Sequence, residues 1–117
     1  MSAVLLRDKV IDSLEGLKGR DIVALDVSGI TDITDFMIIV SGTSNRHVKA
    51  MVDRVAFEAK AAGRPPIGVE GRDTNEWVLV DFDSVVLHVM QPPIREFYDL
   101  ERLWERRGRD AEEESAH

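Results

Sequence analysis

The stretch from Glu76 to Trp104 constrains the fold more than any other part of the chain. It holds two runs rich in β-branched and aromatic residues, Glu76–Phe82 and Val85–Gln91, separated by Asp83-Ser84. Two such runs joined by two turn residues predict a β-hairpin, although Asp-Ser is weaker turn chemistry than Asn-Gly. Pro92-Pro93 then ends the second strand and opens a helix, because the first helical turn tolerates proline.

The turn determines which side chains share a side of this hairpin, because side chains alternate along a strand. One side is wholly apolar, and we expect it to be buried: Val78, Val80, Phe82, Val85, Leu87 and Val89. The opposite side is mixed and carries Trp77, Leu79, Asp81, Val86, His88 and Met90. This mixed side is a candidate surface for a partner. The alternative is that Trp77 and Met90 pack beneath a helix of the same domain.

Length and composition indicate a single domain with its own core. A chain of 117 residues buries roughly two-thirds of its unfolded surface on folding. It has no cysteine, which excludes disulfides, thiolate metal sites and a cysteine nucleophile. No apolar run approaches the length of a membrane span, and the first residues lack the pattern of a secretion or import signal. We therefore expect a cytoplasmic protein without a membrane partner.

The charge of the chain limits the kind of partner. Its net charge of −7 argues against direct binding to DNA or other naked nucleic acid, which requires clustered Lys and Arg. An acidic body is compatible with a basic protein partner, including one that sits on RNA. Residues 108–117 form an acidic tail that we expect to be disordered, so residues 1–107 are the predicted domain.

Hydrophobic periodicity predicts the remaining elements. Helices are expected over Ala3–Leu17, from about Arg46 to Ala62 and from about Pro93 to Arg106. Besides the hairpin, strands are expected over Asp21–Val27, Phe36–Ser41 and Ile67–Val69. Phe36–Ser41 is almost continuously apolar, which favours burial on both faces, and Thr43 or Ser44 is the expected N-cap of the second helix. The order α-β-β-α-β-β-β-α predicts an α/β fold with a mixed sheet of about five strands flanked by helices.

The last helix has an apolar stripe that we expect to face the core: Ile94, Phe97, Leu100, Leu103 and Trp104. Tyr98 lies on the flank of that stripe, so its ring is expected to remain available to a partner. Arg95 and Asp99 are one helical turn apart and are expected to form an ion pair.

Five stretches of the chain form a recognisable combination: Asp35–Val48, Glu70-Gly71, Trp77–Asp81, His88-Val89 and Arg95–Trp104. Together they resemble the ribosomal silencing factor family, also called Iojap-like proteins. The resemblance extends from about Val4 to Trp104, and its most specific parts are D-F-M-I-I-V-S-G-T-S and the closing L-E-R-L-W. Two departures are Asp83-Ser84, where the family commonly has Gly-Asp, and Met90, where an aromatic residue is common.

This resemblance implies a function. Proteins of the family bind the large ribosomal subunit at its ribosomal protein fourteen, on the face that meets the small subunit. Bound there, they block subunit joining and lower translation when nutrients are short. The resemblance also implies a fold similar to nucleotidyltransferases but without their catalytic carboxylates, hence no enzyme activity and no cofactor. A homodimer formed through the mixed hairpin side is left open.

A nucleotide-handling enzyme is the alternative. Gly42-Thr43-Ser44 follows a strand and opens a helix, a position that can hold a phosphate. Asp81 and Asp83 have the acid-x-acid pattern that holds magnesium in nucleotidyltransferases. They lie beyond a full helix and a loop from Ser44, however, and an N-cap and a turn residue explain Ser44 and Asp83 without catalysis. His47 and His88 are too isolated to hold a metal.

Trp77 and Tyr98 are the aromatic side chains that we predict to contact a partner, because such rings bury much area with few rotatable bonds. The predicted protein-binding set is Trp77, Asp81, His88, Met90, Glu96, Tyr98 and Asp99. Its acidic members would face Lys or Arg of the partner. His88 lies diagonal to Asp81 on the hairpin, which predicts a hydrogen bond between them.

Overall fold

The computed structural model describes residues 1–104, so the predicted acidic tail lies outside the described residues. The elements follow the predicted order. They are α1 (Ala3–Gly16), β1 (Arg20–Asp26), β2 (Phe36–Ser41), α2 (Asn45–Ala61), β3 (Gly68–Glu70), β4 (Trp77–Asp81), β5 (Val85–Met90) and α3 (Pro92–Tyr98). The prediction of an α/β fold with a mixed five-stranded sheet and flanking helices is confirmed.

The strands are arranged in the order β1-β2-β5-β4-β3. β2 and β5 run parallel, whereas the other neighbours are antiparallel. The hairpin of β4 and β5 has the predicted register, with Val78 opposite Val89 and Val80 opposite Leu87. The chain between β2 and β5 holds α2, β3 and β4, so these two strands are neighbours in the sheet although they are far apart in the sequence.

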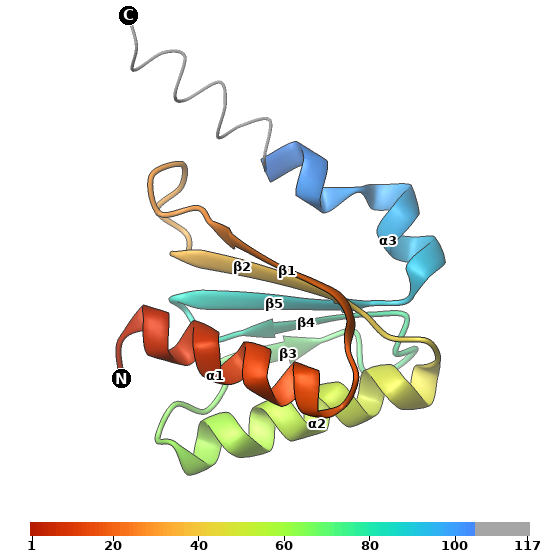
Figure 1. Cartoon of the computed structure of the whole chain (residues 1–117), viewed down its shortest axis with the longest axis horizontal. Helices are drawn as coiled ribbons and strands as arrows, with labels where there is room; N and C mark the ends of the chain where they lie inside the picture. The colour runs from red at the N-terminus through yellow and green to blue at the C-terminus, as the bar shows by residue number, and fades with distance from the viewer. Residues whose placement is uncertain (105–117) are drawn as a thin grey trace, which may run out of the picture.

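One face of the sheet is fully covered, because α1 and α2 lie side by side on it (Figure 1). Its buried side chains form the larger core: Leu6, Val10, Leu14, Phe36, Ile38, Val40, Val48, Met51, Val52, Val55, Ala59, Val78, Val80, Phe82, Val85, Leu87 and Val89. All six apolar residues on the first side of the hairpin belong to this core, as predicted. The buried residues of α2 recur at helical spacing along one side of the helix, as expected for an amphipathic helix.

The second face has a smaller cover. α3 lies on this side of the sheet, away from α1 and α2 (Figure 1). A second cluster of buried residues lies beneath it, consisting of Val27, Met37, Ile39 and Met90. Ile94, Leu100 and Trp104 pack against this cluster. Because both clusters contain residues of β2, every residue of that strand is buried, as its apolar sequence predicted.

The final helix is shorter than predicted. α3 ends at Tyr98, and Asp99 adopts the left-handed conformation (φ 46°) before a second helical segment over residues 100–104. Within α3, Ile94 packs against the second cluster, whereas Phe97 does not. The ring of Phe97 is 80% exposed and the side chain of Leu103 is 48% exposed, so the prediction that these two residues face the core is wrong.

Arg95 holds α3 against the sheet. Its Nη1 donates to Ser41 Oγ at 2.9 Å, and its Nε donates to Glu101 Oε1 at 2.6 Å. The predicted ion pair with Asp99 is therefore replaced by one with Glu101. A charge-assisted pair in a partly buried position is stronger than an exposed helix pair, so this contact fixes both helical segments at the end of β2.

Within residues 1–104, no helix is long and apolar enough to cross a membrane. The likeness to nucleotidyltransferases implied by the sequence stays a prediction. Ser44 is the N-cap of α2, and its Oγ accepts from the His47 backbone N–H at 3.1 Å. The expectation that Thr43 or Ser44 caps this helix is thereby confirmed, with Ser44 as the residue.

We expect Ser44→Ala to lower the free energy of unfolding by about 1 kcal/mol, because the first turn of α2 loses its side-chain acceptor. Urea denaturation followed by circular dichroism measures this change. Ser44→Asp is the matched variant, since aspartate also caps helices, and it should retain most of the stability. Equal loss in both variants would contradict the capping role.

Candidate protein-binding surface

Three aromatic side chains gather where β4 begins and α3 ends: Trp77, Phe97 and Tyr98. The ring centroids of Trp77 and Tyr98 are 4.9 Å apart, and those of Phe97 and Tyr98 are 5.0 Å apart in an edge-to-face arrangement. Tyr98 is 52% exposed and Phe97 is 80% exposed. We call these three residues the aromatic surface. Trp77 is half-buried and packs against the cluster that contains Met90, so it joins the two exposed rings to the core. Exposed rings such as those of Phe97 and Tyr98 are typical of protein-binding sites.

Trp77 is held in place by His88, its diagonal neighbour across the hairpin. The indole Nε1 donates to His88 Nδ1 at 3.0 Å. His88 therefore carries its own hydrogen on Nε2 in the neutral form. Its side chain is only 6% exposed, and this burial lowers the pKa of His88 to about 4. A neutral imidazole at physiological pH is the form that this hydrogen bond requires.

The predicted bond between His88 and Asp81 is wrong. Asp81 Oδ1 instead accepts from the backbone N–H of Asp83 at 2.8 Å, within the turn of the hairpin. Asp83 has a positive φ of 72°, a conformation that aspartate tolerates better than most residues. The carboxylate of Asp81 thus stabilises the turn, while His88 pairs with Trp77.

Two predicted contact residues lie beneath the surface. Met90 is 0% exposed and packs among Met37 and Ile39, so its side chain is not available to a partner. His88 is buried as well. Both belong to the support of Trp77, which lies opposite Met90 in the register of β4 and β5.

The other predicted residues remain at the surface. Glu96 and Asp99 are exposed beside the rings of α3, and Asp81 is half-buried further along β4. The periodicity of the last helix did not predict Phe97 as a surface residue, because the apolar spacing continues unbroken from Ile94 to Trp104. Asp99 lies only a few residues after Pro92-Pro93 in the sequence, and aspartate is a residue type that often ends helices. This short spacing is the signal that could have predicted an early end of α3.

A shallow hollow of about 290 Å³ lies beside Trp77, lined by Glu70, Gly71, Trp77 and Leu79. We call it the Trp77 hollow. Gly71 has a φ of 97°, and a Cβ at this position would lie 2.0 Å from the carbonyl oxygen of Trp77. Only glycine fits here, because any side chain would strain the backbone and collide with β4.

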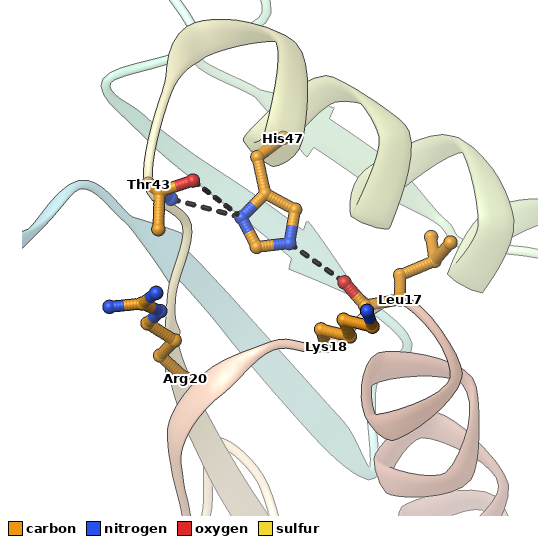
Figure 2. Close-up of a pocket in the computed structure, with 5 residues that line it drawn as sticks. All are labelled: Leu17, Lys18, Arg20, Thr43 and His47. Atoms are coloured by element: carbon orange, nitrogen blue, oxygen red, sulfur yellow. Dashed lines mark hydrogen bonds between the residues drawn. The ribbon is translucent and has the colours of Figure 1, made fainter.

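A second hollow of about 310 Å³ lies near the start of α2, lined by Leu17, Lys18, Arg20, Thr43 and His47 (Figure 2). His47 lies between the two helices on their layer of the fold. Its Nδ1 accepts from the Thr43 backbone N–H at 2.9 Å, and its Nε2 donates to the Leu17 carbonyl at 2.8 Å. His47 thus connects the end of α1 to the start of α2, and both of its nitrogens are used within the fold.

The arrangement of the sheet separates the residues of the enzyme alternative. Ser44 follows the end of β2, whereas Asp81 lies beside the start of β5, which is parallel to β2. A strand of this length spans about 17 Å, so a phosphate at Ser44 would lie far from magnesium held by Asp81 and Asp83. No group of three or more metal-ligating side chains occurs within residues 1–104.

Comparison with known proteins gives a consistent result. A sequence model described as "Ribosomal silencing factor during starvation" matches residues 2–117. The chain is 48% identical to the ribosomal silencing factor RsfS of Haemophilus influenzae over 95 residues, which are 81% of this chain and 93% of that protein. It is 39% identical over 106 residues to the mouse protein named mitochondrial assembly of ribosomal large subunit protein 1, covering 88% of this chain and 46% of that one.

Solved structures show the same fold. A crystal structure of a protein from Chromobacterium violaceum has a TM-score of 0.88 at 44% identity, covering 90% of this chain and 88% of that one. One from Bacillus halodurans has a TM-score of 0.77 at 32% identity, covering 85% and 92%.

The buried His88 predicts a pH dependence of stability. The imidazole takes up a proton near pH 6.5 when the chain is unfolded but only at about 4 when it is folded. The unfolded state therefore binds the proton first as the pH falls, and we expect about 2 kcal/mol of stability to be lost between pH 7 and 5. Urea denaturation at a series of pH values measures this loss.

The control is His88→Gln, which keeps an acceptor for the indole N–H and removes the titrating group. Its stability should change less than that of the wild type between pH 7 and 5. Identical pH dependence in the two proteins would contradict the role given to His88.

Proposed function

The chain belongs to the ribosomal silencing factor family, and on this premise we propose that it silences ribosomes by binding the large ribosomal subunit. The contact on the subunit is its ribosomal protein fourteen, on the face that meets the small subunit. A protein bound there blocks association of the two subunits and represses translation under nutrient limitation. This activity belongs in the cytoplasm, where the subunits join.

The aromatic surface is the observation that supports this proposal most directly. Phe97 and Tyr98 expose large rings to solvent, and Trp77 is fixed beneath them by a hydrogen bond to His88. Exposed rings on a preorganised support lose little conformational entropy on binding. Tryptophan and tyrosine are also enriched among the residues that dominate binding energy.

Charge supports a basic partner. Glu96 and Asp99 are exposed beside the aromatic surface, and the chain has a net charge of −7. Acidic side chains around an apolar contact favour encounter with a positively charged surface. A ribosomal protein that binds RNA has this character, whereas bare RNA would be repelled.

The names of the relatives agree with this target. The protein of Haemophilus influenzae is named a ribosomal silencing factor, and the mouse relative is named for assembly of the ribosomal large subunit. We propose that the chain acts by occupying its site and without catalysis. Support for this comes from the separation of Ser44 from Asp81 and Asp83 on the sheet.

We expect Tyr98→Ala and Phe97→Ala each to weaken binding to purified large subunits by about tenfold or more, since removal of a central ring costs on the order of 2 kcal/mol. Cosedimentation with the subunits measures the affinity, and light scattering measures subunit joining in the presence of each variant. Phe57→Ala is the matched control, because Phe57 is a 72% exposed ring on α2, on the opposite side of the sheet.

The wild type and Phe57→Ala should bind and prevent joining equally well. Subunits that join as readily with the wild-type protein as without it would contradict the proposed function. Equal effects of the Phe57 and Tyr98 substitutions would contradict the location of the surface.

We also propose that free copies of the chain associate through the aromatic surface, because exposed rings that lack their partner favour contact with one another. Such a dimer competes with subunit binding. Light scattering over a range of protein concentrations should show a rising mean mass for the wild type and less for Phe97→Ala. A constant monomer mass would contradict self-association.

A further inference from the structure

The Trp77 hollow has apolar walls and an acidic rim. Trp77 and Leu79 both lie on the second face of the sheet, and Glu70 pairs with Leu79 in the register of β3 and β4. The side chain of Glu70 therefore stands next to the apolar wall. Gly71 fixes the backbone between them, because its conformation and its contact with Trp77 leave room for no other residue. The hollow is thus formed before any partner binds.

The carboxylate of Glu70 is exposed and makes no hydrogen bond or ion pair with any residue between 1 and 104. The cation two positions along the chain, Arg72, is already engaged, since its Nη1 lies 2.8 Å from Asp53 Oδ1 on α2. Asp53 is also bound by Lys49 at 2.7 Å. The guanidinium of Arg72 is therefore paired on the helix side of the sheet and does not neutralise the carboxylate of Glu70 at the hollow.

We propose that the Trp77 hollow binds an arginine side chain of a basic protein on the ribosome, with the guanidinium paired to Glu70 and the aliphatic stem against Trp77 and Leu79. This inference rests on the proposed function for the identity of the partner. It assigns Glu70 as a specificity-determining residue.

The shape and chemistry of the hollow favour arginine. An arginine stem buries its methylene groups against apolar side chains while its charged end remains at the rim. The planar guanidinium stacks on aromatic rings, and tryptophan is the ring that attracts cations most strongly. It also forms paired hydrogen bonds with a carboxylate, which a lysine ammonium cannot do. A volume of about 290 Å³ accommodates one such side chain.

The position of the hollow is consistent with this occupant. Trp77 belongs both to the hollow and to the aromatic surface, so the two are continuous. A partner that covers Tyr98 and Phe97 therefore extends directly over Glu70. One protein can fill both sites in a single encounter, with the acidic rim favouring a basic surface.

Binding to purified large ribosomal subunits provides the first test. We expect Glu70→Gln, which removes the charge and keeps the size, to weaken cosedimentation about tenfold, and Glu70→Lys to weaken it further. Glu15→Gln is the matched control, an exposed acid on α1 on the opposite side of the sheet, and it should change affinity less than twofold. Circular dichroism verifies that each variant is folded. Equal affinities of wild type and Glu70→Gln would overturn the inference.

A second test needs no ribosome. Nuclear magnetic resonance of the isolated protein is recorded during titration with N-acetylarginine amide and, separately, with N-acetylcitrulline amide, which has nearly the same shape but no charge. Arginine should shift the amide signals of Gly71 and Leu79 and the indole signal of Trp77. Citrulline, or arginine added to Glu70→Gln, should shift them much less.

The two tests separate the inference from the function on which it rests. Arginine-specific shifts together with a wild-type protein that ignores large subunits would support the hollow and contradict the proposed function. Subunit binding that is unaffected by Glu70→Gln, or equal shifts with arginine and citrulline, would contradict the hollow and leave the proposed function intact.

Discussion

Parallel pairing of β2 with β5 is the constraint on which the rest of the molecule depends. It places the C-terminal ends of both strands at the same end of the sheet, where Ser41 lies opposite Met90 and Met90 lies opposite Trp77. The helix α3 follows β5 at this end and is held there by Arg95. The hairpin turn therefore lies at the opposite end of the strands. The aromatic surface therefore gathers at one end of the fold, and the acids of the enzyme alternative gather at the other.

The two faces of the sheet have different roles. Two helices seal one face with a large apolar core, which supplies most of the hydrophobic stabilisation. The second face is covered by a short helix and the segment after it. That smaller cover leaves the rings of Phe97 and Tyr98 at its margin. Because the core on the first face stabilises the fold, the second face can remain partly uncovered. The aromatic rings exposed there are available to bind a partner.

Local patterns predicted most of the fold, but contacts between distant residues decided the details of the surface. Alternation of apolar residues predicted the two sides of the hairpin, and helical periodicity predicted the buried stripe of α2. Periodicity did not reveal the break at Asp99, because the helical spacing continues after it. The pairing of Arg95 with Ser41 joins residues 54 positions apart and has no local signal. His88 had two diagonal neighbours, Trp77 and Asp81, and spacing alone does not choose between them. The turn at Asp83 occupies Asp81, which leaves the indole as the partner.

The shortness of α3 has a consequence for motion. A seven-residue helix is only marginally stable by itself, so α3 depends on its tertiary contacts for its order. Its local opening therefore requires less free energy than global unfolding, and the core of α1, α2 and the sheet can remain intact while it opens. Tyr98 leaves Trp77 whenever α3 opens. A partner that needs both rings binds only the molecules in which α3 is closed. Its apparent affinity is therefore reduced in proportion to the fraction of closed molecules.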